Sequence, residues 1–180
     1  MSQRHLLGLI NAVLNYTRVE AGNVSYNYEE VPVAEALSAC EALTLPQMKS
    51  KGLTLQVWPC DISLVVNADR EKLQQIVLNL LTNAIKFTEP GGSVDLRCVA
   101  NGARIEITVT DTGRGIEADQ LDRIFEPFVQ VDARLTRTQE GVGLGLAISR
   151  DLARGMGGDL FVKSTLGKGS TFTVSMPVQA

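Results

Sequence analysis

The segment from residue 70 to residue 87 constrains the fold most, because it carries two separate stripes of residues at helical spacing. One stripe is apolar and continuous, and a helix with such a stripe buries it in a core. The apolar stripe consists of Leu73, Ile76, Val77, Leu80, Leu81, Ala84 and Ile85. The polar stripe, centred about 140° away around the helix, consists of Gln75, Asn79, Asn83 and Lys86. We therefore predict a helix that begins after an N-cap at Asp69.

The polar stripe allows two interpretations. A solvated face is the ordinary one, because most surface helices have such a face. Asparagine forms helices poorly, however, so Asn79 and Asn83 lower helix stability unless a tertiary interaction offsets the loss. Amide oxygens suit Mg²⁺, and Lys86 would offer a point charge to a phosphate. The stripe alone does not distinguish a surface face from the wall of a ligand site.

Two glycine-containing loops bear on that choice. Residues 111–116 (DTGRGI) follow a predicted strand, where glycines permit close backbone approach and the Asp111 carboxylate can accept a hydrogen bond from an amine such as that of adenine. Residues 141–146 (GVGLGL) precede a predicted helix, whose first N–H groups can bind phosphate. Each loop alone is equally compatible with a plain turn, and the second matches neither the dinucleotide-binding pattern nor the P-loop.

Sequence patterns elsewhere predict an α+β fold. Helices are expected over residues 5–20, 33–48, 118–124 and 144–156, and residues 127–143 are expected to form a loop. Strands are expected over residues 53–57, 62–66, 94–98, 105–109, 160–163 and 171–176. Because strands and helices do not alternate strictly, we predict a two-layer α/β sandwich plus an N-terminal helix. Its sheet would be mixed, mostly antiparallel and covered by helices on one face.

Composition excludes several classes of protein. The 180 residues, 44% of them hydrophobic, suit one domain with a short appendage, and the net charge of −3 argues against a nucleic-acid partner. No run of about 18 apolar residues and no signal peptide is visible, so we expect no membrane insertion of this chain. Cys40, Cys60 and Cys98 fit neither a zinc site nor a disulfide framework, and we expect a cytoplasmic location.

The motifs, taken in order, resemble the ATP-binding domain that histidine kinases share with DNA gyrase, the Hsp90 chaperones and MutL. The likeness is closest to sensor histidine kinases and covers roughly residues 30 to 178. Residues 79–88 (NLLTNAIKFT) resemble the asparagine box, and residues 111–116 resemble the first glycine box. Residues 125–128 (FEPF) resemble the phenylalanine box, residues 141–146 the second glycine box, and residues 167–172 (GKGSTF) the closing strand motif.

The resemblance implies that this site binds ATP with Mg²⁺. Asn83 would coordinate the metal, Asn79 would support the metal or its waters, and Lys86 would contact phosphate. These three residues would carry catalysis. Asp111 would bind the adenine amine, and Ser170 would assist through a water. The full set implied in nucleotide binding is Asn79, Asn83, Lys86, Asp111, Gly113, Gly115, Ile116, Phe128, Gly141, Gly143, Leu144, Gly145, Leu146 and Ser170.

The loop over the site departs from the family pattern. The second glycine box of such kinases commonly reads Gly-Gly-Thr/Ser-Gly-Leu-Gly-Leu, whereas Glu140 and Val142 replace its first glycine and its hydroxyl residue. We expect weaker nucleotide affinity or altered behaviour of this loop. Arg134 and Arg137 are interpreted either as phosphate contacts or as ordinary solvated charges. Phe125 and Phe128 are interpreted either as site residues or as core packing.

Residues 1–22 resemble part of the second helix of a dimerising phosphoacceptor hairpin, and residues 23–180 resemble the catalytic domain. The single histidine, His5, is not followed by the acceptor motif, so we interpret it as incidental. We expect this chain to be a piece of a larger kinase that forms a homodimer. The acceptor histidine would lie on a hairpin of a separate domain or chain, and a response-regulator receiver domain would accept the phosphoryl group next.

The expected function is transfer of the γ-phosphoryl group of Mg·ATP to that histidine. One alternative is an ATP-binding regulatory or protein-interaction module without kinase activity, for which the altered second glycine box is the only support. The other alternative is a gyrase- or Hsp90-like ATPase. Asn79 argues against it, because those enzymes have at this position a glutamate that activates water.

Overall fold

The computed structural model describes residues 10–11, 13–14, 16–19, 21–130 and 143–178. Five strands form one sheet in the order β2-β4-β5-β7-β6, in which β2 is parallel to β4 and the other pairs are antiparallel. The strands are β2 (Thr54–Val57), β4 (Ser93–Asn101), β5 (Arg104–Asp111), β6 (Asp159–Thr165) and β7 (Gly169–Pro177). In this order β5, which leads into the first glycine box, lies next to β7, which carries the closing strand motif.

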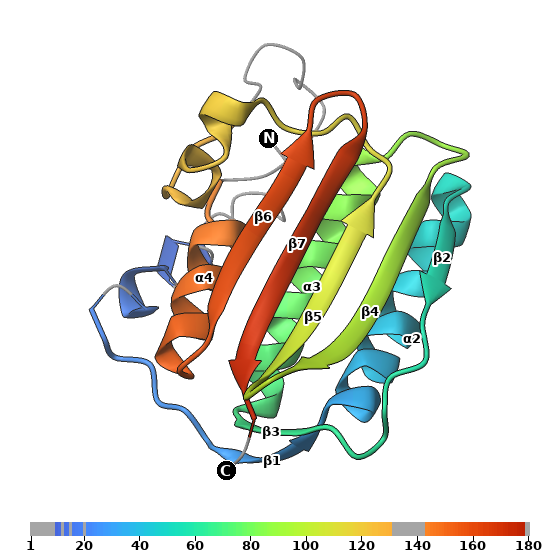
Figure 1. Ribbon diagram of the computed structural model, residues 1–180. Coiled ribbons are helices and arrows are strands. Elements are labelled where there is room, and N and C mark those ends of the chain that lie inside the picture. The colour runs from blue at the N-terminus through green and yellow to red at the C-terminus, as the bar shows by residue number, and fades with distance from the viewer. Residues whose placement is uncertain (1–9, 12, 15, 20, 131–142, 179–180) are drawn as a thin grey trace.

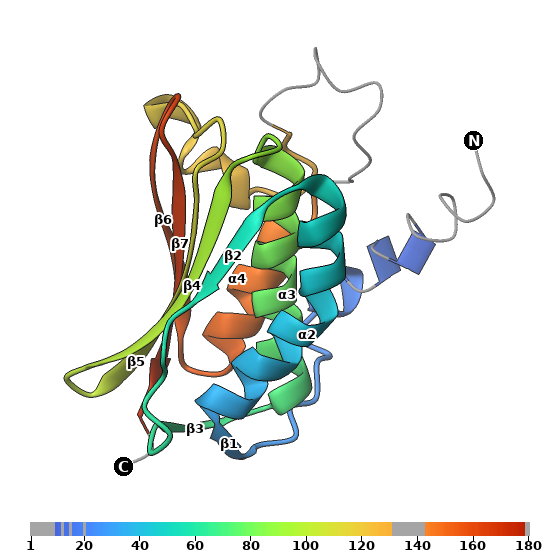
Figure 2. The same ribbon diagram turned by 90° about the vertical axis from the view of Figure 1, so that its right-hand side faces the viewer.

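Three helices cover one face of this sheet, as Figures 1 and 2 show. They are α2 (Val33–Lys51), α3 (Arg70–Phe87) and α4 (Gly145–Gly155). The predicted two-layer α+β sandwich with a mixed, mostly antiparallel sheet is confirmed. Among the described residues, no helix combines the length and apolarity needed to cross a lipid bilayer.

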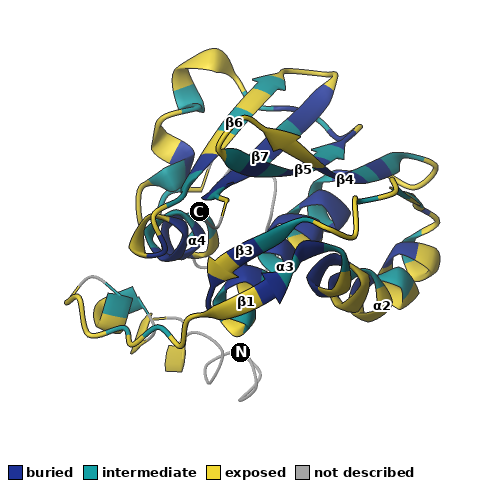
Figure 3. Cartoon of the chain, turned by 60° about the horizontal axis from the view of Figure 1, so that its bottom comes forward, coloured by how far each residue is buried: buried dark blue, intermediate teal, exposed yellow. Residues whose placement is uncertain are grey.

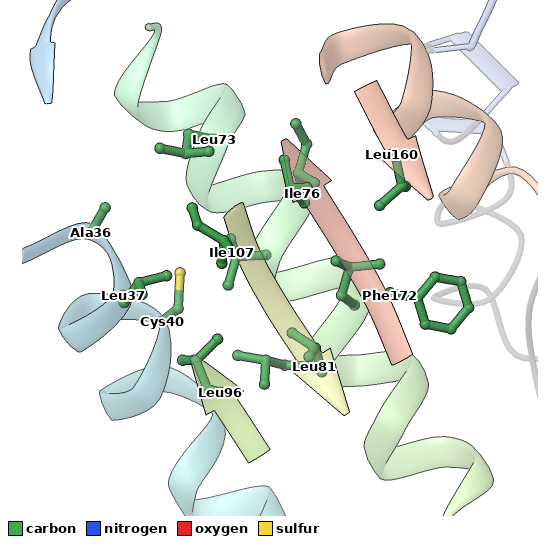
Figure 4. Close-up of a cluster of buried hydrophobic side chains, with 14 of the residues drawn as sticks. Ala36, Leu37, Cys40, Leu73, Ile76, Leu81, Leu96, Ile107, Leu160 and Phe172 are labelled. Carbon is green, nitrogen blue, oxygen red and sulfur yellow. The ribbon is translucent and has the colours of Figure 1, made fainter. Parts of the chain in front are cut away.

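The core lies between the sheet and the helices. All seven residues of the predicted apolar stripe of α3 are buried. Figure 4 shows Leu73, Ile76 and Leu81 of α3 among side chains that include Ile107 of β5 and Phe172 of β7. Along β5, buried residues alternate with partly exposed ones, as expected for a sheet with one covered face. In Figure 3 the buried residues gather between the two layers.

The ends of α3 are set by specific hydrogen bonds. The Asp69 side chain caps the helix, because its Oδ1 accepts a hydrogen bond from the Lys72 N–H at 3.0 Å. Its Oδ2 accepts a second bond, at 2.9 Å, from the backbone N–H of Asn27. At the other end, the Lys51 ammonium of α2 donates to the carbonyl oxygens of Ile85, at 2.6 Å, and Lys86, at 3.0 Å. The predicted N-cap is confirmed.

Several predicted boundaries were wrong. The strand expected over residues 62–66 is β3 (Val65–Ala68), because the Asp61 side chain accepts hydrogen bonds from the N–H and hydroxyl of Ser63 and holds a turn. β3 pairs with β1 (Glu29–Pro32), which was not predicted, in a separate two-stranded sheet. The helix expected over residues 118–124 is two 3-10 turns, η1 (Ala118–Gln120) and η2 (Arg123–Phe125).

The N-terminal segment lies beside α4 in Figure 1. Of the predicted helix over residues 5–20, the described residues 10–11, 13–14 and 16–19 are helical. The linker that follows is attached to the sandwich, because the Tyr28 hydroxyl donates to the Gly155 carbonyl oxygen at 2.9 Å. His5 lies outside the described residues.

We predict that Asp69→Ala lowers the free energy of unfolding by about 1 to 2 kcal/mol, because it removes the N-cap of α3 and the bond to the Asn27 N–H. Urea denaturation measures this change. Asp119→Ala in η1, where the side chain is exposed, is the matched control and should change stability by less than about 0.5 kcal/mol. Equal losses in the two variants would show that the cap contributes nothing.

Candidate functional site

The polar stripe of α3 is exposed at Gln75 and lies against α4 at Asn79. Asn79, Asn83 and Lys86 are all only partly exposed. The Asn79 side chain donates from Nδ2 to Oγ of Ser149, on α4, at 2.9 Å. A Cβ atom at Gly145, in the first turn of α4, would lie 2.5 Å from Oδ1 of Asn79. The interpretation of the stripe as a simple solvated face was therefore wrong, at least for Asn79.

The first turn of α4 supplies backbone N–H groups next to this stripe. Leu144 stands at the N-cap position and makes no side-chain cap hydrogen bond. Leu144 is buried and Leu146 packs against the core, which anchors the turn. Gly143 has a φ of +74°, a conformation that favours glycine. Such a helix start suits an anion. Gly141, Glu140 and Val142 lie outside the described residues.

A buried carboxylate ends β5. Asp111 is 7% exposed, and its Oδ1 accepts a hydrogen bond from the Gly113 N–H at 2.8 Å. Burial raises the pKa of this carboxyl group above its usual value, although backbone hydrogen bonds from Gly113 and Ser170 act in the opposite direction. In the β5–β7 pair, Asp111 lies directly opposite Ser170. A buried carboxylate of this kind can bind an amine donor that reaches it.

Gly113 and Gly115, in the loop after β5, pack directly against the backbone of other segments of the domain. A Cβ at Gly113 would lie 2.5 Å from the carbonyl oxygen of Phe87, and one at Gly115 would lie 2.1 Å from that of Thr165. The loop is thereby packed between the end of α3 and the β6–β7 hairpin. This contact is a second reason for the glycines, besides the ligand approach predicted from the sequence.

Ser164 on β6 links the residues implied at the adenine end. Its Oγ accepts a hydrogen bond from the Ile116 N–H at 2.8 Å and donates to the Gly169 carbonyl oxygen at 2.8 Å. It also lies 2.9 Å from Oγ of Ser170. Ser164 was not predicted as a site residue, because no local sequence pattern distinguishes it from an ordinary strand serine.

A pair of cations around Phe87 was not predicted from the sequence. Lys86 Nζ lies 5.1 Å, and Arg114 Cζ 4.7 Å, from the centroid of the Phe87 ring. Partial burial, and then the charge of Arg114, lower the pKa of the Lys86 ammonium. Positive charge is therefore concentrated at the end of α3, where Lys51 also caps the helix. The approach of Arg114 depends on the fold and leaves no signal at the level of sequence spacing.

The two phenylalanines of residues 125–128 have different surroundings. Phe125 is partly buried against the core, and Arg150 Cζ lies 4.5 Å from its ring centroid. Phe128 is 56% exposed, has a φ of +64° and makes an edge contact with Tyr16, with ring centroids 5.9 Å apart. The core-packing interpretation therefore holds in part for Phe125 and was wrong for Phe128. Arg134 and Arg137 lie outside the described residues.

Residues 68–180 match the family model of the histidine kinase-, DNA gyrase B- and HSP90-like ATPases. The chain belongs to this family. The relatives of this chain within the family include histidine kinases from several bacteria. The chain is therefore an ATP-binding domain of the histidine-kinase type.

Three relatives show the extent of the similarity. A sensor-like histidine kinase of Rhizobium meliloti is 41% identical over 99% of this chain and 34% of its own length. The circadian input-output histidine kinase CikA of Synechococcus elongatus is 39% identical over 99% of this chain and 24% of its own. Full-length ShkA, crystallised in complex with AMPPNP, superposes with a TM-score of 0.86 and 36% identity over 98% of this chain and 36% of its own. This ATP-binding domain thus spans about a quarter to a third of these relatives.

We predict that Asp111→Asn changes how stability depends on pH. Because the pKa of Asp111 is raised in the folded domain, the folded state binds more protons than the unfolded state as pH rises above 3.8, the ordinary value. The free energy of unfolding of the wild type therefore falls as pH rises from 3.8 through the raised pKa of Asp111. The asparagine in the variant does not titrate, so this decrease is absent from the variant. Urea unfolding at a series of pH values, with Asp119→Asn as control, measures this effect. The free energy of unfolding of Asp111→Asn should increase relative to that of the wild type as pH rises. A constant difference would contradict the prediction.

Proposed function

We propose that this domain binds Mg·ATP between the polar stripe of α3, the first turn of α4 and the Asp111 carboxylate. The observation that carries the proposal is the Asn79–Ser149 hydrogen bond, because it holds the Asn79 amide against the helix whose first turn is suited to phosphate. The AMPPNP complex of ShkA supports the same ligand class.

The residues fit a magnesium–triphosphate group chemically. Asn83 would coordinate Mg²⁺ and Asn79 would support the metal or its waters, since amide oxygens are hard ligands. Magnesium would neutralise charge that develops on the phosphates. Lys86 would contact phosphate. Asp111, which lies opposite Ser170, would accept a hydrogen bond from the adenine amine. By the family resemblance, Gly113, Gly115, Ile116 and Phe128 would also contact the nucleotide.

We further propose that the domain supports phosphoryl transfer to a histidine on a separate hairpin. A nitrogen of that histidine would form a bond to the γ-phosphorus while the bond from the γ-phosphorus to the bridging oxygen breaks, and ADP would leave. The protein's contribution would be positioning and charge neutralisation, which dominate such reactions. Arg114 and Lys86, near the same ring, would add to the positive charge.

The surroundings of the domain are proposed by analogy with the relatives. Residues 1–22 would belong to the second helix of the acceptor hairpin, and residues 23–180 would form the catalytic domain. The full-length kinase would be a homodimer that passes the phosphoryl group to a response-regulator receiver domain. Cys40, Cys60 and Cys98 are free thiols, which supports a cytoplasmic location.

We predict that Asn83→Ala lowers the affinity for Mg·ATP at least about tenfold, because a hydrogen-bonded or metal-bound amide oxygen is lost next to charged groups. Isothermal titration calorimetry with and without EDTA measures the change. Asp111→Asn is the matched comparison: it should retain the dependence on Mg²⁺ and lose the preference for ATP over GTP. Wild-type affinity in Asn83→Ala would remove the metal assignment.

We predict that the domain transfers label from [γ-³²P]ATP to a separately supplied acceptor hairpin of the Rhizobium meliloti relative. Label on the hairpin should be stable to base and labile to acid, as a phosphoramidate is, and should vanish when the acceptor histidine is replaced by glutamine. ATP binding without label would favour a regulatory binding module. Rapid ATP hydrolysis in the absence of the hairpin would instead favour a gyrase-like ATPase.

A further inference from the structure

Ser149 is a buried hydroxyl at the centre of the contact between α3 and α4. It is 2% exposed and lies among the buried apolar residues of α4. Alanine would occupy nearly the same volume and favours helix more strongly. What serine adds here is its Oγ atom, which accepts the hydrogen bond from Nδ2 of Asn79 at 2.9 Å.

The opposite end of the same amide lies over the first turn of α4. Oδ1 of Asn79 is 2.5 Å, and Nδ2 3.2 Å, from the place that a Cβ would occupy at Gly145. Only glycine leaves room for the amide there. Gly145 and Ser149 are four residues apart and therefore share one face of α4. Together they form a seat for the Asn79 amide on α4.

The orientation matters because the two ends of an amide are chemically opposite. The oxygen accepts hydrogen bonds and coordinates cations, whereas the NH₂ group only donates. A half-turn about the last side-chain bond would exchange them, and that torsion has only a weak preference of its own. In the structure Nδ2 is bonded to Ser149, and Oδ1 is the amide atom nearer Gly145 in the first turn of α4, the proposed phosphate site.

We infer that Ser149 is a positioning residue, which holds the Asn79 amide with its oxygen directed at the magnesium ion or its waters. This inference rests on the proposed Mg·ATP function and deepens it. It adds a residue outside every motif that identified the site. Ser149 itself touches neither nucleotide nor metal in this scheme and acts only through Asn79.

The test is the Mg²⁺ concentration needed for half-maximal ATP binding, measured by calorimetry on the complete chain. Ser149→Ala should raise that concentration roughly 3- to 10-fold, the range expected for one lost hydrogen bond. Binding of ADP in EDTA should stay within about twofold of wild type. Ser149→Thr retains the hydroxyl and should restore the wild-type dependence on Mg²⁺.

Two controls separate positioning from packing. Ser175→Ala removes another buried hydroxyl, which accepts a hydrogen bond from Nε of Arg104 at 2.6 Å on the far end of β7, and should leave the Mg²⁺ dependence unchanged. In an Asn79→Ala background, Ser149→Ala should add nothing, because coupled residues are not additive. An unchanged Mg²⁺ dependence in Ser149→Ala, or an undiminished effect without Asn79, overturns the inference.

The same data distinguish failure of this inference from failure of the proposed function. If wild-type ATP binding ignores Mg²⁺, or if Asn83→Ala binds Mg·ATP normally, the metal site itself is refuted. If wild type requires Mg²⁺ and Asn83→Ala loses it, while Ser149→Ala matches wild type, the metal site stands and only the role of Ser149 is rejected.

Discussion

The burial of the α3 apolar stripe against the sheet is the constraint on which the rest of the structure depends. Each of its larger side chains gains about 1.5 to 3 kcal/mol on burial, whereas one hydrogen bond such as Asn79–Ser149 contributes about 1 kcal/mol. Burial therefore sets the rotation of α3 about its axis, and Asn79 of the polar stripe lies on the α4 side as a consequence. The hydrogen bond to Ser149 then holds a side chain that is already in place.

Much of this arrangement was predictable because it is encoded locally. The two stripes of α3 and the cap at Asp69 follow from spacing within one helix, and the Asn101-Gly102 turn marks the β4–β5 hairpin. The Asp111 carboxylate and the glycines at residues 113 and 115 were likewise visible as a short motif. Here the local preferences agree with the fold, as expected for a sequence with one stable structure.

What escaped prediction depends on residues that meet only after folding. Ser164 joins Ile116 to Ser170 across strands, Lys51 caps a helix about 35 residues further on, and Arg114 reaches Phe87. β1 has only four residues, of which one is fully buried, so it lacks an alternating pattern to detect. The exposed position of Phe128 contradicts the usual burial of aromatic side chains, and its edge contact with Tyr16 joins segments far apart in the sequence.

The attachment of the linker to α3 has a mechanical consequence. The last hydrogen bond of the N-terminal helical turn involves the N–H of Asn23, and the next fixed point is the Asn27 N–H on Asp69. The four residues from one point to the other extend to at most about 14 Å. This length limits how far the sandwich can rotate relative to the N-terminal helix. A wider excursion must break the Asn27–Asp69 bond, and Asp69 also caps α3. Large movements of the sandwich relative to the N-terminal helix would therefore disturb the N-terminus of α3, the helix that carries Asn79 and Asn83.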